Sequence, residues 1–445
     1  MSESSQLENT PIDSACTRRV ALKSGLVAAI AGGCAGVEST SLAQATADGS
    51  LAMPADQWWC WRGPRGDNTT APDAQAPQQP DPSKVRWAVD VPGRGHSSPV
   101  VTDDAIYLTT GDKQQQIQAV LGFDRATGKP LFQTVVHRGG IPAKNHPKNT
   151  EASPTVAFDG RSLFASFYNS DAIQLTSLTT DGKIRWTKKI APFDPQRYQF
   201  GYGASPLLYG NTVIVASEMD LGAWLVALDR QSGKEVWRTP RPKMITFSSP
   251  IVANVAGRDQ LLISGANLVC SYDPSNGRML WQTPATTAAT CGTMVWNSTH
   301  VFASGGYPDS QTVCVAADGS GKVQWSNNQK CYEQSMLVVG NHLYGVTDAG
   351  VGHCWDVSDG RVIWRQRLGG KWSSSPVLVG DLIYAFNESG DGWVFESGRD
   401  RFVQRSQVRV ADEVFSTPTV VGDTMYLRVA NGSGQSRREK LLAMI

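Results

Sequence analysis

One stretch decides the fold of this chain: Ser373-Ser-Ser-Pro376-Val-Leu-Val-Gly380-Asp381-Leu-Ile-Tyr384. The pattern returns, with substitutions, as Ala204-Ser-Pro206-Leu-Leu-Tyr-Gly210-Asn211-Thr-Val-Ile214. A pattern that recurs every 20–50 residues or so is typical of repeat architectures, in which each copy folds as one unit and stacks on its neighbours. We therefore expect most of the repeated positions to be structural.

One residue in each copy marks the repeat, a proline in six copies and a methionine in two. These anchors are Pro99, Pro154, Pro206, Pro250, Met294, Met336, Pro376 and Pro418. Successive anchors lie 40 to 55 residues apart, a spacing that suits either a four-stranded propeller blade or a unit of two to three helices. Short β-branched and aromatic runs such as Leu382-Ile-Tyr-Ala-Phe, bounded by glycine and aspartate, indicate strands and turns rather than helices.

A second motif, Asp-x-x-Ser/Thr-Gly-x-x-x-Trp, follows the first within many copies of the repeat. Its aspartate can accept backbone N–H bonds in a turn, and its glycine suits a left-handed position. Its tryptophan is expected to pack between neighbouring blades, because large aromatic side chains bury most of their area in cores. The best-kept copies consist of Asp229, Gly233 and Trp237, of Asp273, Gly277 and Trp281, and of Asp356, Gly360 and Trp364.

Together these patterns predict an all-β fold, an eight-bladed β-propeller over residues 85–445, in which each blade is a four-stranded antiparallel sheet. The last copy, residues 416–445, has room for three strands. We expect the fourth strand from Val85-Arg-Trp87-Ala-Val-Asp90, ahead of the first anchor. This N-terminal strand would close the ring and protect the sheet edges from aggregation.

Residues 1–45 are predicted to be a signal peptide of the twin-arginine type. Arg18 and Arg19 precede a modest apolar stretch, and Ala43-Gln-Ala45 offers a cleavage site of small residues. The protein is therefore expected in the periplasm or outside the cell. Residues 31–33 before Cys34 depart from a lipoprotein box, so we expect no lipid anchor there.

Residues 46–84 form an irregular lead-in rich in proline and tryptophan. Its segment Trp58-Trp-Cys-Trp61-Arg-Gly-Pro64 carries three tryptophans that need burial. We expect the lead-in to dock against the propeller, and a partner-binding peptide is the alternative.

Charge and hydropathy argue against a nucleic-acid-binding protein and against a protein with a transmembrane helix. The formal net charge of +1 argues against a nucleic-acid partner, and no apolar run reaches the 20 residues or so that a transmembrane helix needs. We expect a monomer.

Six cysteines follow the predicted signal: Cys60, Cys270, Cys291, Cys314, Cys331 and Cys354. Cys270 and Cys314 occupy equivalent positions in adjacent blades and should not be bonded, because stacked sheets lie about 10 Å apart. A bridge between Cys291 and Cys331 stays open.

Through these two repeated motifs, the sequence from residue 97 to the C-terminus resembles the pyrroloquinoline-quinone-like (PQQ-like) β-propeller repeat family. The lead-in Trp59-x-Trp61-Arg-Gly-Pro64 looks like one found in secreted bacterial members. The resemblance implies one of two branches. Quinoprotein dehydrogenases hold the quinone with calcium, use an aspartate base and carry a vicinal cysteine pair. Non-catalytic members include the lipoprotein that assists β-barrel assembly in the outer membrane.

This chain has no adjacent cysteines and no Cys-x-x-Cys-His haem motif. Its blades are short, whereas the dehydrogenases carry long insertions. We therefore expect an exported, non-catalytic module that binds an envelope protein or glycan, with no catalytic residue, no metal and no cofactor. The alternative is a dehydrogenase of alcohols or sugars that depends on PQQ and calcium. No constellation of side chains identifies a hydrolase or lyase.

The long first two copies indicate where a site would lie. Their extra residues fall in 136–151 and 191–202, which we expect on one face of neighbouring blades. Polar residues of these loops and of nearby turns are predicted to form a binding funnel for a polar ligand or a partner's loop. An ordinary solvated loop surface is the alternative. The candidates are His96, His146, Glu151, Asp171, Arg197, Tyr198, Glu218, Asp220 and Glu333.

Overall fold

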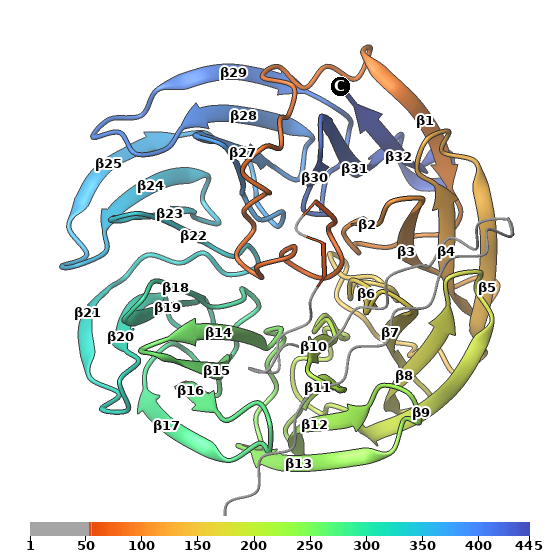
Figure 1. Ribbon diagram of the computed structural model, residues 1–445, viewed down its shortest axis with the longest axis horizontal. Helices are drawn as coiled ribbons and strands as arrows, with labels where there is room; N and C mark the ends of the chain where they lie inside the picture. The colour runs from red at the N-terminus through yellow and green to blue at the C-terminus, as the bar shows by residue number, and fades with distance from the viewer. Residues whose placement is uncertain (1–52, 55) are drawn as a thin grey trace, which may run out of the picture. The chain divides into compact units, whose positions relative to one another are not determined.

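The computed structural model describes residues 53, 54 and 56–445. The predicted signal peptide, residues 1–45, and Cys34 lie outside this part of the chain. Eight four-stranded antiparallel sheets are arranged around a central axis (Figure 1). The prediction of an eight-bladed β-propeller is therefore confirmed. Among the described residues, no helix has the length and apolar character needed to span a membrane.

The first four blades contain strands β2–β17 in chain order. Blade 1 consists of β2 (Val100–Val101), β3 (Ala105–Asp112), β4 (Ile117–Asp124) and β5 (Pro130–Arg138). Blade 2 consists of β6 (Ala157–Phe158), β7 (Ser162–Asn169), β8 (Ala172–Thr179) and β9 (Ile184–Pro192). Blade 3 consists of β10 (Leu207–Tyr209), β11 (Thr212–Glu218), β12 (Ala223–Asp229) and β13 (Glu235–Arg241). Blade 4 consists of β14 (Ile251–Val255), β15 (Arg258–Gly265), β16 (Leu268–Tyr272) and β17 (Met279–Pro284).

The next three blades contain β18–β29. Blade 5 consists of β18 (Val295–Trp296), β19 (His300–Gly305), β20 (Gln311–Ala316) and β21 (Val323–Asn327). Blade 6 consists of β22 (Leu337–Val339), β23 (His342–Val346), β24 (Val351–Asp356) and β25 (Val362–Arg367). Blade 7 consists of β26 (Val377–Val379), β27 (Leu382–Phe386), β28 (Asp391–Glu396) and β29 (Gln404–Arg409).

Blade 8 combines the two ends of the propeller. It contains β30 (Thr419–Val421), β31 (Thr424–Asn431), β32 (Arg438–Met444) and, as its outer strand, β1 (Val85–Val91). A short 3-10 helix, η1 (Gly434–Ser436), precedes β32. Strand β1 runs antiparallel to β32, with Val89 opposite Leu441. The predicted closure by an N-terminal strand is therefore confirmed.

The core lies between neighbouring blades. Middle strands such as β7 are buried along nearly their whole length, whereas outer strands such as β9 expose most of their residues. A strand covered by a blade on each side needs apolar residues on both faces, which explains the continuous run Leu163-Phe-Ala-Ser-Phe167.

The second motif packs blade 4 against blade 3. Asp229 Oδ1 accepts the backbone N–H of Ser232 at 2.8 Å, and this turn places Gly233 at a φ of +67°. A Cβ at Gly277 would lie 2.5 Å from the indole of Trp237 in the preceding blade. Glycine therefore supplies both the backbone conformation and the space for the neighbouring tryptophan. The expected packing of these tryptophans between blades agrees with this contact.

The register corrects one anchor of the sequence repeat. Ala157 of β6 faces Phe164 as Val100 of β2 faces Tyr107. Counting back from these pairs, Val156 is the equivalent of Pro99, whereas Pro154 stands two residues earlier. Pro154 is therefore not the structural equivalent of the other anchors, and the insertion before blade 2 is two residues longer than the sequence repeat suggested.

The lead-in docks against the propeller and crosses the centre of the ring (Figure 1). Trp58 bridges to Val101 of β2, and Thr69 bridges in parallel to Leu378 of β26. Trp58 and Trp59 are buried, and Phe158 donates its backbone N–H to the carbonyl of Trp59 at 2.8 Å. The expectation of docking is thus met within the chain itself.

All six cysteines of the described residues are free. Cys270 and Cys314 are unbonded, as expected. The bridge left open between Cys291 and Cys331 does not form. Burial raises the pKa of both of these thiols, which makes their reactive thiolate forms scarce.

Candidate functional site

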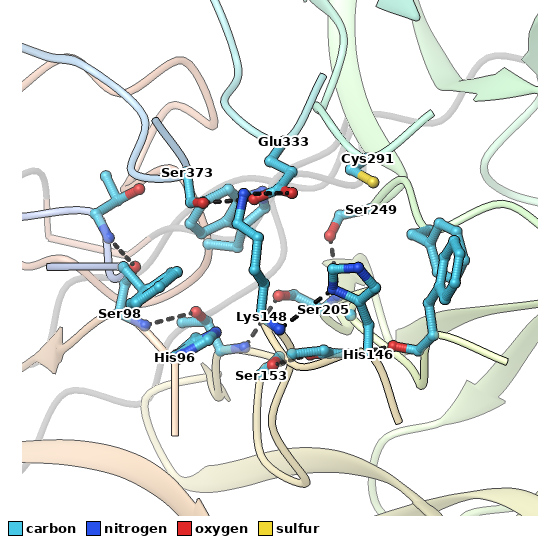
Figure 2. A pocket seen from close by; sticks show the side chains of 18 of the residues that line it. His96, Ser98, His146, Lys148, Ser153, Ser205, Ser249, Cys291, Glu333 and Ser373 are labelled. Atoms are coloured by element: carbon cyan, nitrogen blue, oxygen red, sulfur yellow. Dashed lines mark hydrogen bonds and ion pairs between the residues drawn. The ribbon is translucent and has the colours of Figure 1, made fainter. Parts of the chain in front are cut away.

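A pocket of about 270 Å³ lies at the axis of the propeller (Figure 2). Its lining combines aromatic rings, hydroxyl groups and one ion pair. The aromatic and imidazole rings come from Trp61, His96, His146, Phe200, Phe247, Tyr332 and Phe415. The lead-in supplies Trp61, and the connections between blades supply the others.

Eight hydroxyl side chains form what we call the hydroxyl ring, each placed just before the first strand of its blade. They are Ser98, Thr155, Ser205, Ser249, Thr293, Ser335, Ser375 and Thr417. Between seven of the eight neighbouring pairs around the axis, the backbone N–H of one member donates to the hydroxyl oxygen of the next at 2.9–3.1 Å. The hydroxyl of Thr293 accepts the indole N–H of Trp61 at 2.8 Å. The ring thus ties the inner strands together and connects them to the lead-in.

Lys148 holds two acidic side chains together beside the pocket. Its Nζ lies 2.9 Å from Glu333 Oε1 and 2.7 Å from Glu388 Oε1. Ser373 Oγ lies 2.8 Å from Glu388 Oε1 and within hydrogen-bonding distance of Glu333 Oε2, so its one proton can be donated to either carboxylate. Burial alone would lower the pKa of Lys148, but the two carboxylates outweigh this effect and raise it. The ammonium group is therefore fully charged at neutral pH.

His96 and Phe415 form a flat wall of the pocket. Their rings stack at 4.4 Å between centroids, with 6° between their planes. Burial, followed by the charges of Arg94 and Arg428, lowers the pKa of His96 well below its usual value. The imidazole is accordingly neutral at pH 7. Within residues 56–445, its Nε2 atom has no hydrogen-bond partner.

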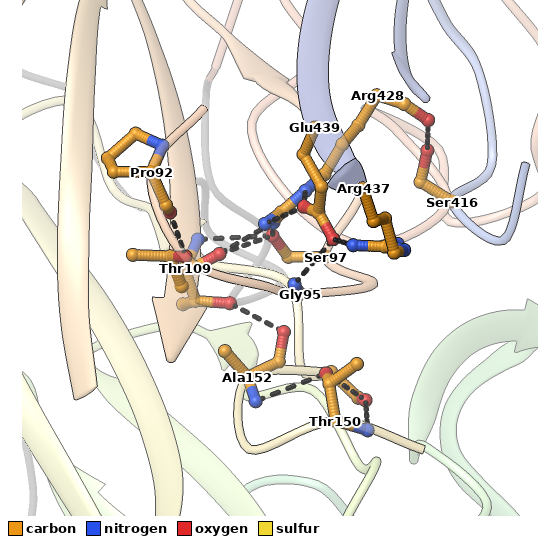
Figure 3. Close-up of polar contacts among 12 residues, drawn as sticks. Pro92, Gly95, Ser97, Thr109, Thr150, Ala152, Ser416, Arg428, Arg437 and Glu439 are labelled. Atoms are coloured by element: carbon orange, nitrogen blue, oxygen red, sulfur yellow. Dashed lines mark hydrogen bonds and ion pairs between the residues drawn. The ribbon is translucent and has the colours of Figure 1, made fainter. Parts of the chain in front are cut away.

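A buried ionic network supports the loop that carries His96 (Figure 3). Arg428 Nε donates to Glu439 Oε2 at 2.7 Å, and Arg428 Nη1 donates to the carbonyl of Thr109 at 2.7 Å. Glu439 Oε1 accepts an N–H of Arg437 at 2.8 Å and the backbone N–H of Gly95 at 3.3 Å. A Cβ at Gly95 would lie 2.5 Å from Arg428 Nη1, so this position requires glycine for close approach. The network joins blade 8 to blade 1 where the ring closes.

An aromatic ridge, which we define as Tyr198, Phe200 and Tyr307, borders the pocket. Tyr198 meets Tyr307 edge-on at 5.0 Å and lies 5.8 Å from Phe200. Phe200 also contacts His146 edge-on at 4.9 Å. Phe200 is 37% exposed and Tyr307 is 43% exposed. The ridge therefore presents large aromatic surfaces to solvent.

The two long insertions meet on one face, as their positions suggested. Asn149 Nδ2 donates to the carbonyl of Phe200 at 2.6 Å, which joins residues 136–151 to residues 191–202. His146 accepts the backbone N–H of Lys148 on Nδ1 at 3.2 Å. These contacts fix the loop that directs Lys148 toward the opposite side of the axis.

The structure gathers only part of the predicted funnel. His96, His146 and Glu333 line the pocket, and Tyr198 belongs to the ridge. The remaining candidates lie outside the pocket lining: Glu151, Asp171, Arg197, Glu218 and Asp220.

Glu218 is the clearest departure from the expectation. It ends β11 and is buried, with Oε1 2.6 Å from Nε of Arg241. Burial raises its pKa, although Arg241 opposes the shift. Asp220 instead accepts the backbone N–H of Arg197 at 2.9 Å and so anchors the second insertion. Neither carboxylate lines the pocket.

Sequence reasoning missed the most regular feature of the site. Seven of the eight members of the hydroxyl ring stand immediately before an anchor in the sequence, and the eighth, Thr155, directly follows the anchor Pro154. Lys148 had no such signal, because its two partners lie in distant copies of the repeat. Glu388 likewise stands in an ordinary turn between β27 and β28.

Among residues 53, 54 and 56–445, no group of three or more His, Cys, Asp or Glu side chains is arranged to hold a metal ion. The pocket's acidic groups are instead engaged by Lys148 and Ser373.

These features define an eight-bladed propeller of the PQQ-like repeat type with a pocket at its axis. Residues 118–366 and 309–438 match the family described as "Outer membrane protein assembly factor BamB". Because the match covers more than half of the sequence, the chain belongs to this family.

Individual relatives are distant. The outer membrane protein assembly factor BamB of Burkholderia pseudomallei (strain K96243) is 22% identical over an alignment of 357 residues, which covers 76% of this chain and 83% of that protein. The crystal structure of BamB from Moraxella catarrhalis superposes with a TM-score of 0.59 at 15% identity, covering 81% of this chain and 97% of that one.

Dehydrogenases share the fold to a similar degree. A europium-containing methanol dehydrogenase gives a TM-score of 0.61 at 12% identity, covering 85% of this chain and 90% of its own. The quinohemoprotein alcohol dehydrogenase ADHIIG from Pseudomonas putida HK5 gives 0.58 at 10% identity, covering 88% and 80%. At these identities the structural likeness establishes the fold alone.

Proposed function

We propose that this protein is a non-catalytic binding module of the cell envelope, which docks a protein partner through the aromatic ridge. Membership in the BamB family supports an envelope role. The observation that carries the proposal is the ridge, where Phe200 and Tyr307 stay exposed although both take part in aromatic contacts. Tyrosine and other aromatic residues are enriched at protein interfaces and often dominate their binding energy.

Partner capture tests the ridge directly. The exported protein would be used to recover partners from envelope extracts, alongside a double variant with Tyr198→Ala and Tyr307→Ala. We expect recovery to fall at least tenfold, since aromatic hot spots contribute about 2 kcal/mol or more. Leu131→Ala is the matched control, because Leu131 is 53% exposed on outer strand β5. Equal recovery by the double variant and the control would contradict the proposal.

Export is the second part of the proposal. We propose that residues 1–45 direct the folded protein through the twin-arginine pathway, that it works as a monomer in the periplasm or outside the cell, and that Cys34 carries no lipid. The pair Arg18 and Arg19 supports this route. Replacing both by lysine should leave the protein in the cytoplasmic fraction. An unchanged distribution in cell fractionation would argue against this pathway.

A dehydrogenase that depends on PQQ and calcium is the alternative function, because its fold is shared by the two dehydrogenases. The pocket chemistry does not fit the quinone. PQQ is a planar tricarboxylate, whereas Lys148 beside the pocket is engaged by Glu333 and Glu388. Two carboxylates opposite one ammonium would repel the ligand. We therefore propose that the protein binds no PQQ and catalyses no oxidation.

Equilibrium dialysis with PQQ and calcium tests this alternative, followed by dye reduction with alcohols and sugars. We expect neither retention of the quinone nor turnover. Retention together with turnover would reverse the assignment.

A further inference from the structure

The axial pocket shares Phe200 with the aromatic ridge that borders it, but the rest of its lining lies outside the ridge. Hydroxyl groups surround one end of the pocket and ring systems form its walls (Figure 2). Lys148 and Glu333 add one ion pair to the lining, and Glu388 also contacts Lys148. These three features together indicate the chemistry of a ligand.

The hydroxyl ring offers unused hydrogen-bond donors. Ser98, Ser205 and Ser249 each accept a backbone N–H on the side-chain oxygen. A serine hydroxyl can also donate one proton. Within the described part of the chain, the protons of these three hydroxyls have no acceptor. Because all three line the pocket, they can donate to a ligand rich in oxygen atoms.

The walls offer flat apolar surfaces. The neutral His96 ring stacks on Phe415, and Phe200 meets His146 at the other side of the pocket. The face of an aromatic ring carries partial negative charge, and C–H groups carry partial positive charge. A ligand with a C–H face and hydroxyls at its edge can therefore satisfy both the walls and the ring.

The charges around the pocket favour a ligand without net charge. An anion would approach the carboxylates of Glu333 and Glu388, and a cation would approach Lys148. A cation would also meet the positive charges of Arg94, Arg428 and Arg437, which add to burial, the larger cause, in lowering the pKa of His96. A neutral hydroxyl pair can instead donate to Glu333 and accept from Lys148, whose ammonium carries three donors and has two carboxylate partners.

We propose that the axial pocket binds one neutral sugar unit, a hexose or N-acetylhexosamine, either free or as part of a longer glycan. The volume of about 270 Å³ suits a single unit. This site shares Phe200 with the proposed protein-docking ridge, but its hydroxyl groups and its wall of His96 and Phe415 lie outside that ridge, so it does not depend on protein docking there.

Ligand-observed NMR and calorimetry on the full exported protein test the site. The probes are glucose, galactose and N-acetylglucosamine, the charged analogues glucuronate and glucosamine, and a trimer of N-acetylglucosamine. We expect at least one neutral sugar to bind with a Kd of about 1 mM, and its charged analogues to bind at least tenfold more weakly. Tighter binding of the trimer than of the monomer would identify a glycan as the source, and equal binding would identify a free sugar. Absence of binding by every neutral probe at millimolar concentration, or preference for a charged probe, would overturn the proposal.

Two matched variants connect binding to the pocket. Phe415→Ala removes one wall and should weaken sugar binding at least tenfold. Phe402→Ala is the control, because Phe402 is also half-buried but packs against Trp364 away from the axis. Should Phe415→Ala fail to fold, Ser373→Ala removes a donor to Glu333 and Glu388 and should weaken binding as well. Equal affinity in pocket variants and control would refute the site. Partner recovery by Phe415→Ala, measured as above, separates failure of this site from failure of the ridge.

Discussion

At the outer edge of the propeller the same side chains recur from blade to blade, whereas the connections around the axis differ in nearly every blade. Gly277 packs on Trp237 as Gly360 packs on Trp325. Around the axis, one insertion carries Lys148 across to Glu333 and Glu388, and nothing in the other blades repeats this contact. The hydroxyl ring lies between these extremes, since it is repeated yet lines the pocket. Repetition therefore marks what holds the ring together, and departures from repetition mark where it can bind.

The largest expected effect comes from the outer edge. Trp237→Ala should destabilise the protein by about 3–5 kcal/mol, because it leaves a large cavity between blades 3 and 4. Val236→Ala should change stability by about 0.5 kcal/mol or less, since Val236 is 53% exposed. Urea unfolding of both variants measures the difference. Similar midpoints would mean that the outer edge does not hold the blades together.

Glycine at the outer edge should rank next. Gly277→Ala introduces a side chain at a φ of +73°, at a cost of about 1–3 kcal/mol, and its Cβ also clashes with Trp237. Gly257→Ala is a matched control, because Gly257 has a φ of +78° with open space around it. Thermal unfolding should show a larger loss for the variant at 277. Equal losses of thermal stability in the two variants would mean that the contact with Trp237 does not contribute to the effect at position 277.

The hydroxyl ring should respond less strongly. Ser205→Ala deprives the buried N–H of Thr155 of its acceptor and should cost about 1–3 kcal/mol. Ser205→Thr keeps the hydroxyl and should retain most of the stability. Chemical denaturation of the two variants distinguishes the hydrogen bond from simple packing. If alanine and threonine behave alike, the ring has no role in closing the inner strands.

The smallest effect concerns acid stability. The side-chain hydrogen bond from Ser232 lowers the pKa of Asp229 below its usual value. The carboxylate therefore contributes stability above the unfolded pKa of about 4, and this contribution is lost as pH falls through the lower folded pKa. Asp229→Asn should flatten the dependence of stability on pH in that acid range. An unchanged slope would show that these turns do not sense pH.

Much of the fold could be predicted because blade architecture depends on local chemistry. Turn positions with a positive φ favour glycine, as at Gly380, where φ is +58°. The closing strand could be predicted because the last copy of the repeat has room for only three of the four strands of a blade. The shift from Pro154 to Val156 escaped prediction, since a proline two residues away satisfied the same pattern.

The site was predicted less well. His96, His146 and Glu333 could be placed near the axis because they stand close to anchors or in the long connections. Glu218 was misplaced because the pattern does not say whether the last residue of a strand points outward or into a neighbouring blade. Its partner Arg241 comes from the end of the fourth strand of the same blade.

The sequence by itself determined the number of blades, the hairpins within them and the strand that closes the ring, because each depends on residues close together in the chain or on a missing repeat unit. Only the tertiary structure decided that Lys148 meets Glu333, 185 residues away. Closing a ring brings remote connections to one axis, and the distance between them depends on blade packing and loop path. No local propensity encodes that distance, which is why the pocket's chemistry became visible only in three dimensions.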